Sequence, residues 1–347
     1  MDSSHTQNLS NNRVEWIDAA RGIALIFVLL GHSSLPAVFA NLIYTFHIPL
    51  FFFLSGFVFS AGKWKNIRDL FKYKCNKMII PYFSLGFVLI SVYFFRFAAD
   101  VRRDDLIIYL LKGLIIQERF EVIWFLTCLF LTEIIFYGLI KILKNRYDYL
   151  IIAMLISAVI GYFYFTFAAV PLPWNADICF MVIPFFGTGY LLKNQNIPIV
   201  KYCRPWIIII MASANILFGC LNSSISGETI DLVGFSIGNF FLYYIAAFTG
   251  IFAVALSCII LPKCRLLNFL GRNTLIYFAW HSGIAFPLIY TLYDSLHWFQ
   301  ANNFWNNLMN GILTVVLTIL LLTPIHLAIQ KSPLCFMIGR RRIIKDE

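Results

Sequence analysis

Residues 21–32 read RGIALIFVLLGH, an apolar stretch that opens with an arginine and closes with a histidine. Each residue turns an α-helix by ~100°, so the eleven positions from Arg21 to His32 return to almost the same face. We therefore expect both side chains on one stripe, about 16 Å apart along the helix axis at ~1.5 Å per residue. A guanidinium and an imidazole are costly within hydrocarbon, so this pair predicts a functional site.

The composition is that of a membrane protein. Of the 347 residues, 60% are hydrophobic and only 13% are charged, and the mean hydropathy is +0.79. A soluble globular protein is less apolar than this. Segments long enough to cross ~30 Å of hydrocarbon recur along the chain. They lie at residues 18–38, 42–60, 79–97, 122–142, 149–168, 177–192, 205–221, 236–260, 273–293 and 306–329.

These segments predict an all-α polytopic membrane protein with about ten transmembrane helices. The apolar stretch 106–117 is shorter and contains Lys112, so we expect an interfacial helix there. The polar ends, 1–15 and 331–347, are too short to fold alone. We expect them to be short cytoplasmic tails of a single membrane domain, 1–347.

Lys and Arg are concentrated in alternate loops. Of the intervening loops, 168–176, 222–235 and 294–305 contain neither residue. The exception is the loop 98–121, where three arginines are offset by five acidic residues: Arg102, Arg103 and Arg119 against Asp100, Asp104, Asp105, Glu118 and Glu121. Because basic loops face the cytoplasm, both termini are expected there. The net charge of +10 is then a result of topology and does not indicate a nucleic-acid partner. A cleaved signal peptide at the N-terminus is the competing reading, but its basic region would contain Glu15 and Asp18, and cleavage would break the alternation.

The eight cysteines show no metal-ligand spacing, and none lies clearly in an external loop. We therefore expect no metal site and no disulfide framework.

Three histidines are candidates to share one cavity. His32 ends the first predicted span, and His47 opens the second after a short external turn near 36–41. His281 is predicted at a compatible depth in the ninth span. A single histidine in an apolar helix is commonly a packing residue, but three at compatible depth, together with Arg21 on the first helix, favour a function.

Other charged residues in or near the predicted spans also need an explanation. Asp18 lies one turn before Arg21 and can neutralise it, while Glu133 is a candidate for pairing between helices. The basic loop 63–77 is either an anchor for anionic lipid or a cradle for a polyanionic cytosolic cosubstrate. In the second reading, Lys74 and Lys77 point at the mouth of the cavity.

The motifs, taken in order, resemble the integral-membrane acyltransferase-3 family, bacterial ten-helix O-acyltransferases that decorate cell-surface glycans. The resemblance covers nearly the whole chain. It is carried by WIDAARGIALIFVLLGH (16–32), FHIPLFFFLSGF (46–57), KCNKMIIPYF (74–83), IWFLTCLF (123–130), IPFFGTGYLL (183–192) and LGRNTLIYFAWH (270–281).

The resemblance implies roles for individual residues. Arg21 and His32 are expected to be essential, and Lys74 and Lys77 are expected to meet the acyl-CoA. The family usually has arginine at those two positions, and lysine keeps the charge without the bidentate fork that suits phosphate. The resemblance further implies that the acceptor or acyl site is lined by His47, Trp124 and His281.

The function implied is that of a membrane O-acetyltransferase of the bacterial cytoplasmic (inner) membrane. It would move acetyl from cytosolic acetyl-CoA to a sugar hydroxyl of a surface or lipid-linked polysaccharide, such as O-antigen, lipopolysaccharide or exopolysaccharide. A neutral His32 would act as general base or as nucleophile, with Arg21 on the CoA side. The alternative is a glycan exporter without acyl-transfer activity, because intramembrane His and Arg also mark substrate paths. We find no inverted repeat or paired broken helices typical of such folds.

Overall fold

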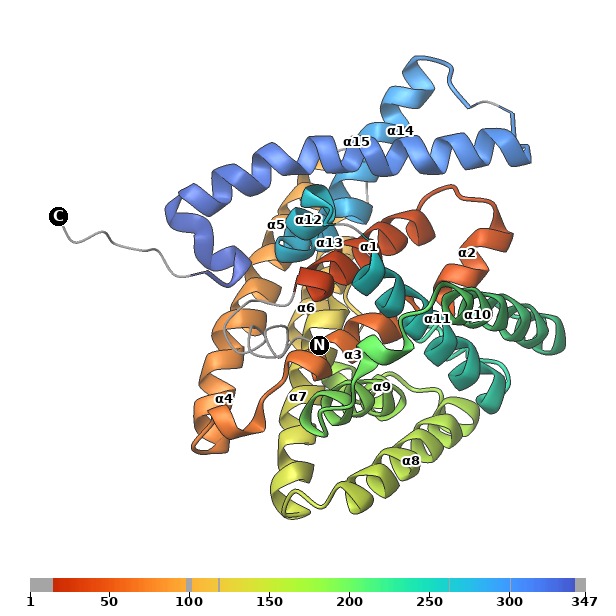
Figure 1. Ribbon diagram of the computed structural model, residues 1–347. Helices are drawn as coiled ribbons and strands as arrows, with labels where there is room; N and C mark the ends of the chain where they lie inside the picture. Colours follow the sequence, from red (N-terminus) through yellow and green to blue (C-terminus); the bar gives the residue numbers. More distant parts are fainter. Residues whose placement is uncertain (1–14, 98–101, 118, 262, 300, 341–347) are drawn as a thin grey trace.

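The computed structural model describes residues 15–97, 102–117, 119–261, 263–299 and 301–340, and these form a single helical bundle (Figure 1). The described residues contain no strand, only an isolated bridge between Asp231 and Ser236. Figure 1 shows α15 (Phe304–Lys331) along one side of the bundle and α8 (Tyr147–Phe163) along the opposite side. The fold is therefore all-α, as the sequence predicts.

Nine helical segments of the described chain are long and apolar enough to cross a membrane. They correspond to nine of the ten predicted spans. The first predicted span is α1 (Glu15–His32), which contains Glu15, Asp18 and Arg21 within 18 residues. Large apolar side chains cover the outside of the bundle, including Leu155 (62% exposed), Ile209 (64%) and Leu320 (63%). Exposed apolar surface on this scale fits a lipid-facing exterior and not a water-facing one.

Helix α1 packs inside the bundle against α12 (Arg265–Arg272), α3 (His47–Val58) and α11 (Phe240–Ile260). Two glycines allow the close approach of α1 and α12. A Cβ built on Gly22 would lie 2.2 Å from the carbonyl oxygen of Leu267, and one on Gly271 would lie 1.8 Å from that of Asp18. Only glycine fits at such a backbone contact. The contact brings Arg272 against the buried Asp18.

The first turn lies earlier than predicted. We expected it near 36–41, but α1 ends at His32 and α2 (Ala37–Tyr44) already begins at Ala37, followed by α3. Pro36 precedes α2, and proline, which lacks an N–H donor, is well placed at the start of a helix. The Ser33 hydroxyl donates to the Leu30 carbonyl, 2.8 Å away, at the end of α1. The turn is therefore residues 33–36.

The predicted basic loop 63–77 is largely helical. After Asn66, whose side chain accepts from the Asp69 N–H, α4 (Ile67–Lys74) continues through a π turn (Cys75–Ile79) into α5 (Ile80–Arg96). Lys74 and Lys77 therefore lie on an unbroken helical rod. Such π turns are frequent at functional sites.

The next three helices include the predicted short one. Helix α6 (Arg103–Ile116) has 14 residues, which is too short for a span and agrees with an interfacial helix. Helices α7 (Trp124–Ile142), α8 and α9 (Ala176–Asn194) follow; α9 packs against α3, α7 and α8.

The second half of the chain completes the bundle. Helix α10 (Pro205–Ser226) packs on α11, and α13 (Thr274–Trp280), a π turn (His281–Ala285) and α14 (Phe286–Ser295) form one continuous span. Of the predicted tails, residues 1–14 and 341–347 lie outside the described residues. Residues 333–338 form a short 3-10 helix that folds back onto α15 and α5.

Candidate active site

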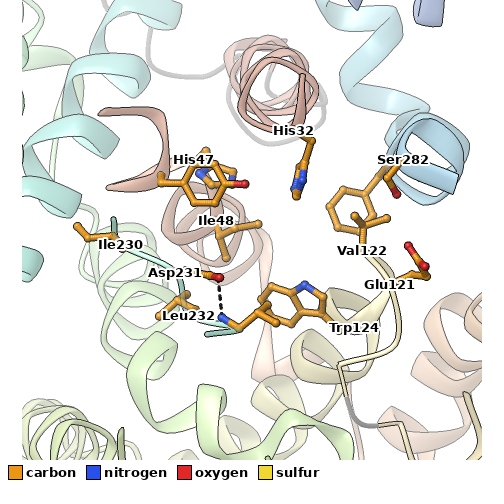
Figure 2. Close-up of a pocket in the computed structure, with 13 residues that line it drawn as sticks. His32, His47, Ile48, Glu121, Val122, Trp124, Ile230, Asp231, Leu232 and Ser282 are labelled. Carbon is orange, nitrogen blue, oxygen red and sulfur yellow. Dashed lines mark hydrogen bonds between the residues drawn. The ribbon is translucent and has the colours of Figure 1, made fainter. Parts of the chain in front are cut away.

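A cavity of about 320 Å³ lies where α1, α2, α3, α7 and the π turn after α13 meet. We call it the histidine cavity. Figure 2 shows His32, Trp124, Glu121 and Asp231 facing one space from different sides. Its walls are His32, Tyr44, His47, Ile48, Glu121, Val122, Trp124, Ile230, Asp231, Leu232, Val233, Phe278 and Ser282.

The three predicted histidines lie together. The ring of His32 is 5.1 Å from that of His281 and 6.0 Å from that of Tyr44, and the Tyr44 ring is 4.9 Å from His47. Distances are between ring centroids. His32 and His47 line the cavity, whereas His281 is not among its lining residues and stands against His32. Four rings therefore follow one another in contact, in the order His281, His32, Tyr44 and His47. The last three come from the hairpin of α1, α2 and α3, and His281 comes from the span that begins with α13.

Backbone carbonyls fix the orientation of two of these rings. His47 Nδ1 donates to the Ile43 carbonyl at 2.8 Å, and His281 Nδ1 donates to the Phe278 carbonyl at 2.8 Å. A carbonyl only accepts, so the proton is on Nδ1 and each Nε2 carries the lone pair when the ring is neutral. The Nε2 atom of His281 is buried and has no hydrogen-bond partner within the described part of the chain. An unpaired buried acceptor of this kind is costly unless a ligand or neighbour uses it.

Two carboxylates, both missed by the sequence reasoning, enter the histidine cavity from loops. Glu121 precedes α7 and accepts from the Tyr93 hydroxyl at 2.8 Å. Asp231 lies between α10 and α11 and accepts from the Val233 N–H at 2.9 Å, the bond drawn in Figure 2.

Arg119 ties these loops together and was also missed. Its guanidinium pairs with the fully buried Asp177 at 2.6 Å and donates to the Val233 carbonyl at 3.0 Å. It also lies 4.4 Å from the centre of the Phe235 ring. Three segments distant in sequence are thus fixed by one side chain. In the sequence, Arg119 is only a loop charge offset by neighbouring acids, because nothing local marks its distant partners.

A second cavity, of about 290 Å³, lies at the Arg21 end of α1. We call it the basic cavity. Arg21, Lys74, Lys77 and Arg272 line it, together with the carboxylate Glu133. Lys74 pairs with Glu133 and Arg272 with Asp18, so the four cations leave an excess of positive charge, of the kind that suits a polyanion. The helical rod of α4 and α5 carries the two lysines to the same place as Arg21.

Interhelical contacts hold the basic side chains. Lys74 pairs with Glu133 at 2.5 Å, so Glu133 does pair between helices. Arg272 donates to Asp18 at 2.7 Å. Lys77 donates to the Gly339 carbonyl, and Arg340 donates to Asn273 at 2.8 Å, so the segment after α15 closes one edge of this region.

An aromatic partition separates the two cavities. The rings of Phe51, Phe125 and Phe278 contact one another, with centroids 5.3 to 6.5 Å apart. Phe278 lines both cavities. The cationic and imidazole ends of α1 therefore open into two spaces with one shared wall.

The predicted site residues fall into these two spaces, except His281, which was predicted to line the acceptor or acyl site but stands behind His32 and lines neither cavity. Trp124 lines the histidine cavity with His32 and His47, and Arg21 lines the basic cavity with Lys74 and Lys77. Trp298 and Trp305, two exposed aromatic residues of the 294–305 region, line neither cavity. Within the described residues, no group of three or more His, Cys, Asp or Glu is placed to hold a metal ion.

Comparison with known proteins gives one family. Residues 14–327 match the acyltransferase-3 family model, which is described as an acyltransferase domain. That range contains both cavities, except for the contacts made by Gly339 and Arg340. No curated protein and no solved structure gives a significant match. Because the family model covers nearly the whole chain, the protein belongs to the acyltransferase-3 family and is a membrane acyltransferase.

Proposed function

We propose that the protein transfers acetyl from acetyl-CoA to a sugar hydroxyl of a surface or lipid-linked polysaccharide. The observation that carries the proposal is the position of His32 and Arg21 on one helix, each in its own cavity, with Phe278 as the common wall. The donor would bind in the basic cavity and the acceptor in the histidine cavity. The reaction would take place where the two spaces approach each other.

The basic cavity suits the donor because a nucleotide phosphate is a polyanion. Arg272 and Arg21 supply guanidinium groups, which bind phosphate through paired N–H donors. Lys74 and Lys77 add point charges at the same mouth. The arm that carries the thioester would run past the Phe51, Phe125 and Phe278 rings towards His32.

The excess of Lys and Arg on alternate loops supports an orientation for this path. Basic loops face the cytoplasm, so the basic cavity would open to the side where acyl-CoA is made. The histidine cavity would open to the opposite side of the bacterial cytoplasmic membrane, where surface glycans are assembled.

The chemistry needs one base and one proton donor. A neutral His32 would take the proton of the sugar hydroxyl as its oxygen attacks the thioester carbonyl carbon. The carbon–sulfur bond breaks, the sugar ester forms, and His32 returns the proton to the CoA thiolate. His281, whose Nδ1 proton is held by backbone carbonyls, would orient the His32 ring from behind.

Mass spectrometry of the host's surface glycans tests the proposal directly. Deleting the gene should remove one class of acetyl ester, and a wild-type copy should restore it while His32→Ala does not. Membrane levels of the variant, measured by immunoblot, control for misfolding. Unchanged acetylation together with blocked export of the glycan would overturn the proposal in favour of an exporter.

A further inference from the structure

The histidine cavity has a definite charge. Glu121 and Asp231 both line it, and none of its described lining residues is Lys or Arg. Figure 2 shows the two carboxylate-bearing side chains on different sides of the space, with Trp124 between them and His32 opposite. A ligand that enters this cavity therefore meets negative charge at the position where His32 would act.

Within the described part of the chain, no Lys or Arg forms an ion pair with Glu121 or Asp231. Arg119, the basic residue that fixes the loops, is already paired with Asp177 through two hydrogen bonds of 2.6 and 3.1 Å. Its Nε donates to the Val233 carbonyl, which leaves the guanidinium directed at the protein. Arg119 is thus a positioning residue for the loop that carries Asp231.

The remaining polar atoms of the cavity suit hydroxyl groups. Carboxylate oxygens accept strong hydrogen bonds from hydroxyls. The Ser282 hydroxyl is buried at the wall with no partner among the described residues, and Tyr44 adds a phenol. The Trp124 ring offers an apolar face of the kind that packs on a sugar ring.

We propose that the histidine cavity selects an uncharged sugar unit and excludes one with a carboxylate or phosphate, with Glu121 and Asp231 as the specificity-determining residues. This inference rests on the proposed function and narrows its acceptor. Hydroxyls of a neutral sugar satisfy the carboxylate oxygens. An anionic sugar would place like charges together in a partly desolvated site, which costs binding free energy.

Paired glycosides that differ only at one carbon provide the test. The purified full-length protein in nanodiscs is given radiolabelled acetyl-CoA and either p-nitrophenyl β-glucoside or p-nitrophenyl β-glucuronide. We expect kcat/KM for the glucoside to exceed that for the glucuronide by about tenfold or more. Binding of radiolabelled acetyl-CoA without any glycoside, measured in parallel, reports whether the donor site is intact.

Neutral variants identify the residues responsible. The double variant Glu121→Gln/Asp231→Asn should reduce the preference at least several-fold towards equality, because the amides keep similar shapes without the charge. Asp294→Asn is the matched control, since Asp294 is exposed and lines neither cavity. It should leave both acceptors unchanged.

Each outcome decides the matter. Equal use of both glycosides, a preference for the glucuronide, or an unaltered preference in the double variant would overturn the inference while leaving acetyl transfer established. Binding of acetyl-CoA without transfer to either glycoside would also count against a sugar-selective cavity. Absence of both acetyl-CoA binding and transfer would instead refute the proposed function.

Discussion

The rings of Phe125 and Phe278 lie 5.3 Å apart between the two cavities, and Phe278 forms part of both walls. The size of the side chain at position 278 should therefore control which acyl group reaches His32. Phe278→Leu would enlarge the passage without adding a polar atom. Two more methylenes in the acyl chain contribute about 1.6 kcal/mol when buried, which corresponds to roughly tenfold in rate.

We accordingly expect Phe278→Leu to raise kcat/KM for butyryl-CoA relative to acetyl-CoA by about tenfold. Competition between the two donors, followed by mass spectrometry of the product, measures the ratio. Phe52→Leu is the control, because Phe52 is buried against Phe125 but lines neither cavity. The same ratio in wild type and Phe278→Leu would remove Phe278 from the acyl path.

The contact between the His32 and His281 rings predicts that substitutions at the two positions lower the rate of acetyl transfer by different amounts. His32→Ala should lower acetyl transfer by about 10²–10⁴-fold, the usual contribution of a general base. His281→Asn should lose less than His281→Ala, since the asparagine amide can still donate to the Phe278 carbonyl in place of Nδ1. Single-turnover transfer rates check both. Equal rates for the two His281 variants would argue against an orienting role.

Lys74 should matter for donor binding more than for chemistry. Lys74→Ala is expected to raise the KM for acetyl-CoA by about tenfold with a smaller effect on kcat, because a charge contact to the donor is lost. The double variant Lys74→Ala/Glu133→Gln avoids leaving the buried Glu133 unpaired, since Glu133 is only 3% exposed.

Lys72→Ala is the matched control for that series. Lys72 is exposed on the same helix, two positions away, and does not line the basic cavity. Initial rates across a range of acetyl-CoA concentrations give the comparison. A loss of kcat at unchanged KM in the double variant would place Lys74 outside the donor site.

The close contact between α1 and α12 predicts that one added methyl group at Gly271 lowers the stability of the protein. Gly271→Ala would push a Cβ against the Asp18 carbonyl, and overpacking of this kind costs about 1–3 kcal/mol or more. Gly138→Ala, also in a helix but with nothing within 4 Å of its Cβ, should be neutral or stabilising. Thermal unfolding of the detergent-solubilised variants separates them. Similar melting temperatures would mean that the two helices can move apart freely.

The Arg119–Asp177 pair predicts a stability effect that a second substitution relieves. Arg119→Ala leaves the fully buried Asp177 without its cation, which costs about 3–5 kcal/mol. Arg119→Met/Asp177→Asn removes the unpaired charge and should recover much of the melting temperature. An additive loss in the double variant would show that the pair is not the cause.

Local sequence signals were sufficient for the helices and for the Arg21–His32 pair. Hydropathy and a period of 3.6 residues depend on neighbours along the chain, so the spans and the shared stripe follow from them. The turn was predicted too late because the first span was extended to residue 38, although Ser33, Ser34 and Pro36 follow His32 almost directly.

The loop residues of the site were beyond such signals. Arg119 meets Val233, 114 positions away, and Asp177, 58 positions away, so its role exists only after folding. The Phe51, Phe125 and Phe278 partition was hidden for a different reason. The chain has 36 phenylalanines, and no pattern in the sequence distinguishes these three from the others.

The fold-back of the segment after α15 affects how the protein should be handled in the laboratory. Gly339 accepts a hydrogen bond from Lys77, which lines the basic cavity, and Arg340 donates one to Asn273. Gly339 and Arg340 lie beyond residue 327, the last residue of the family match. A purification tag or reporter fused directly after this segment would pull on the lysine side of that pocket. Epitopes and fluorescent fusions are better attached through a long spacer or at the opposite end of the polypeptide.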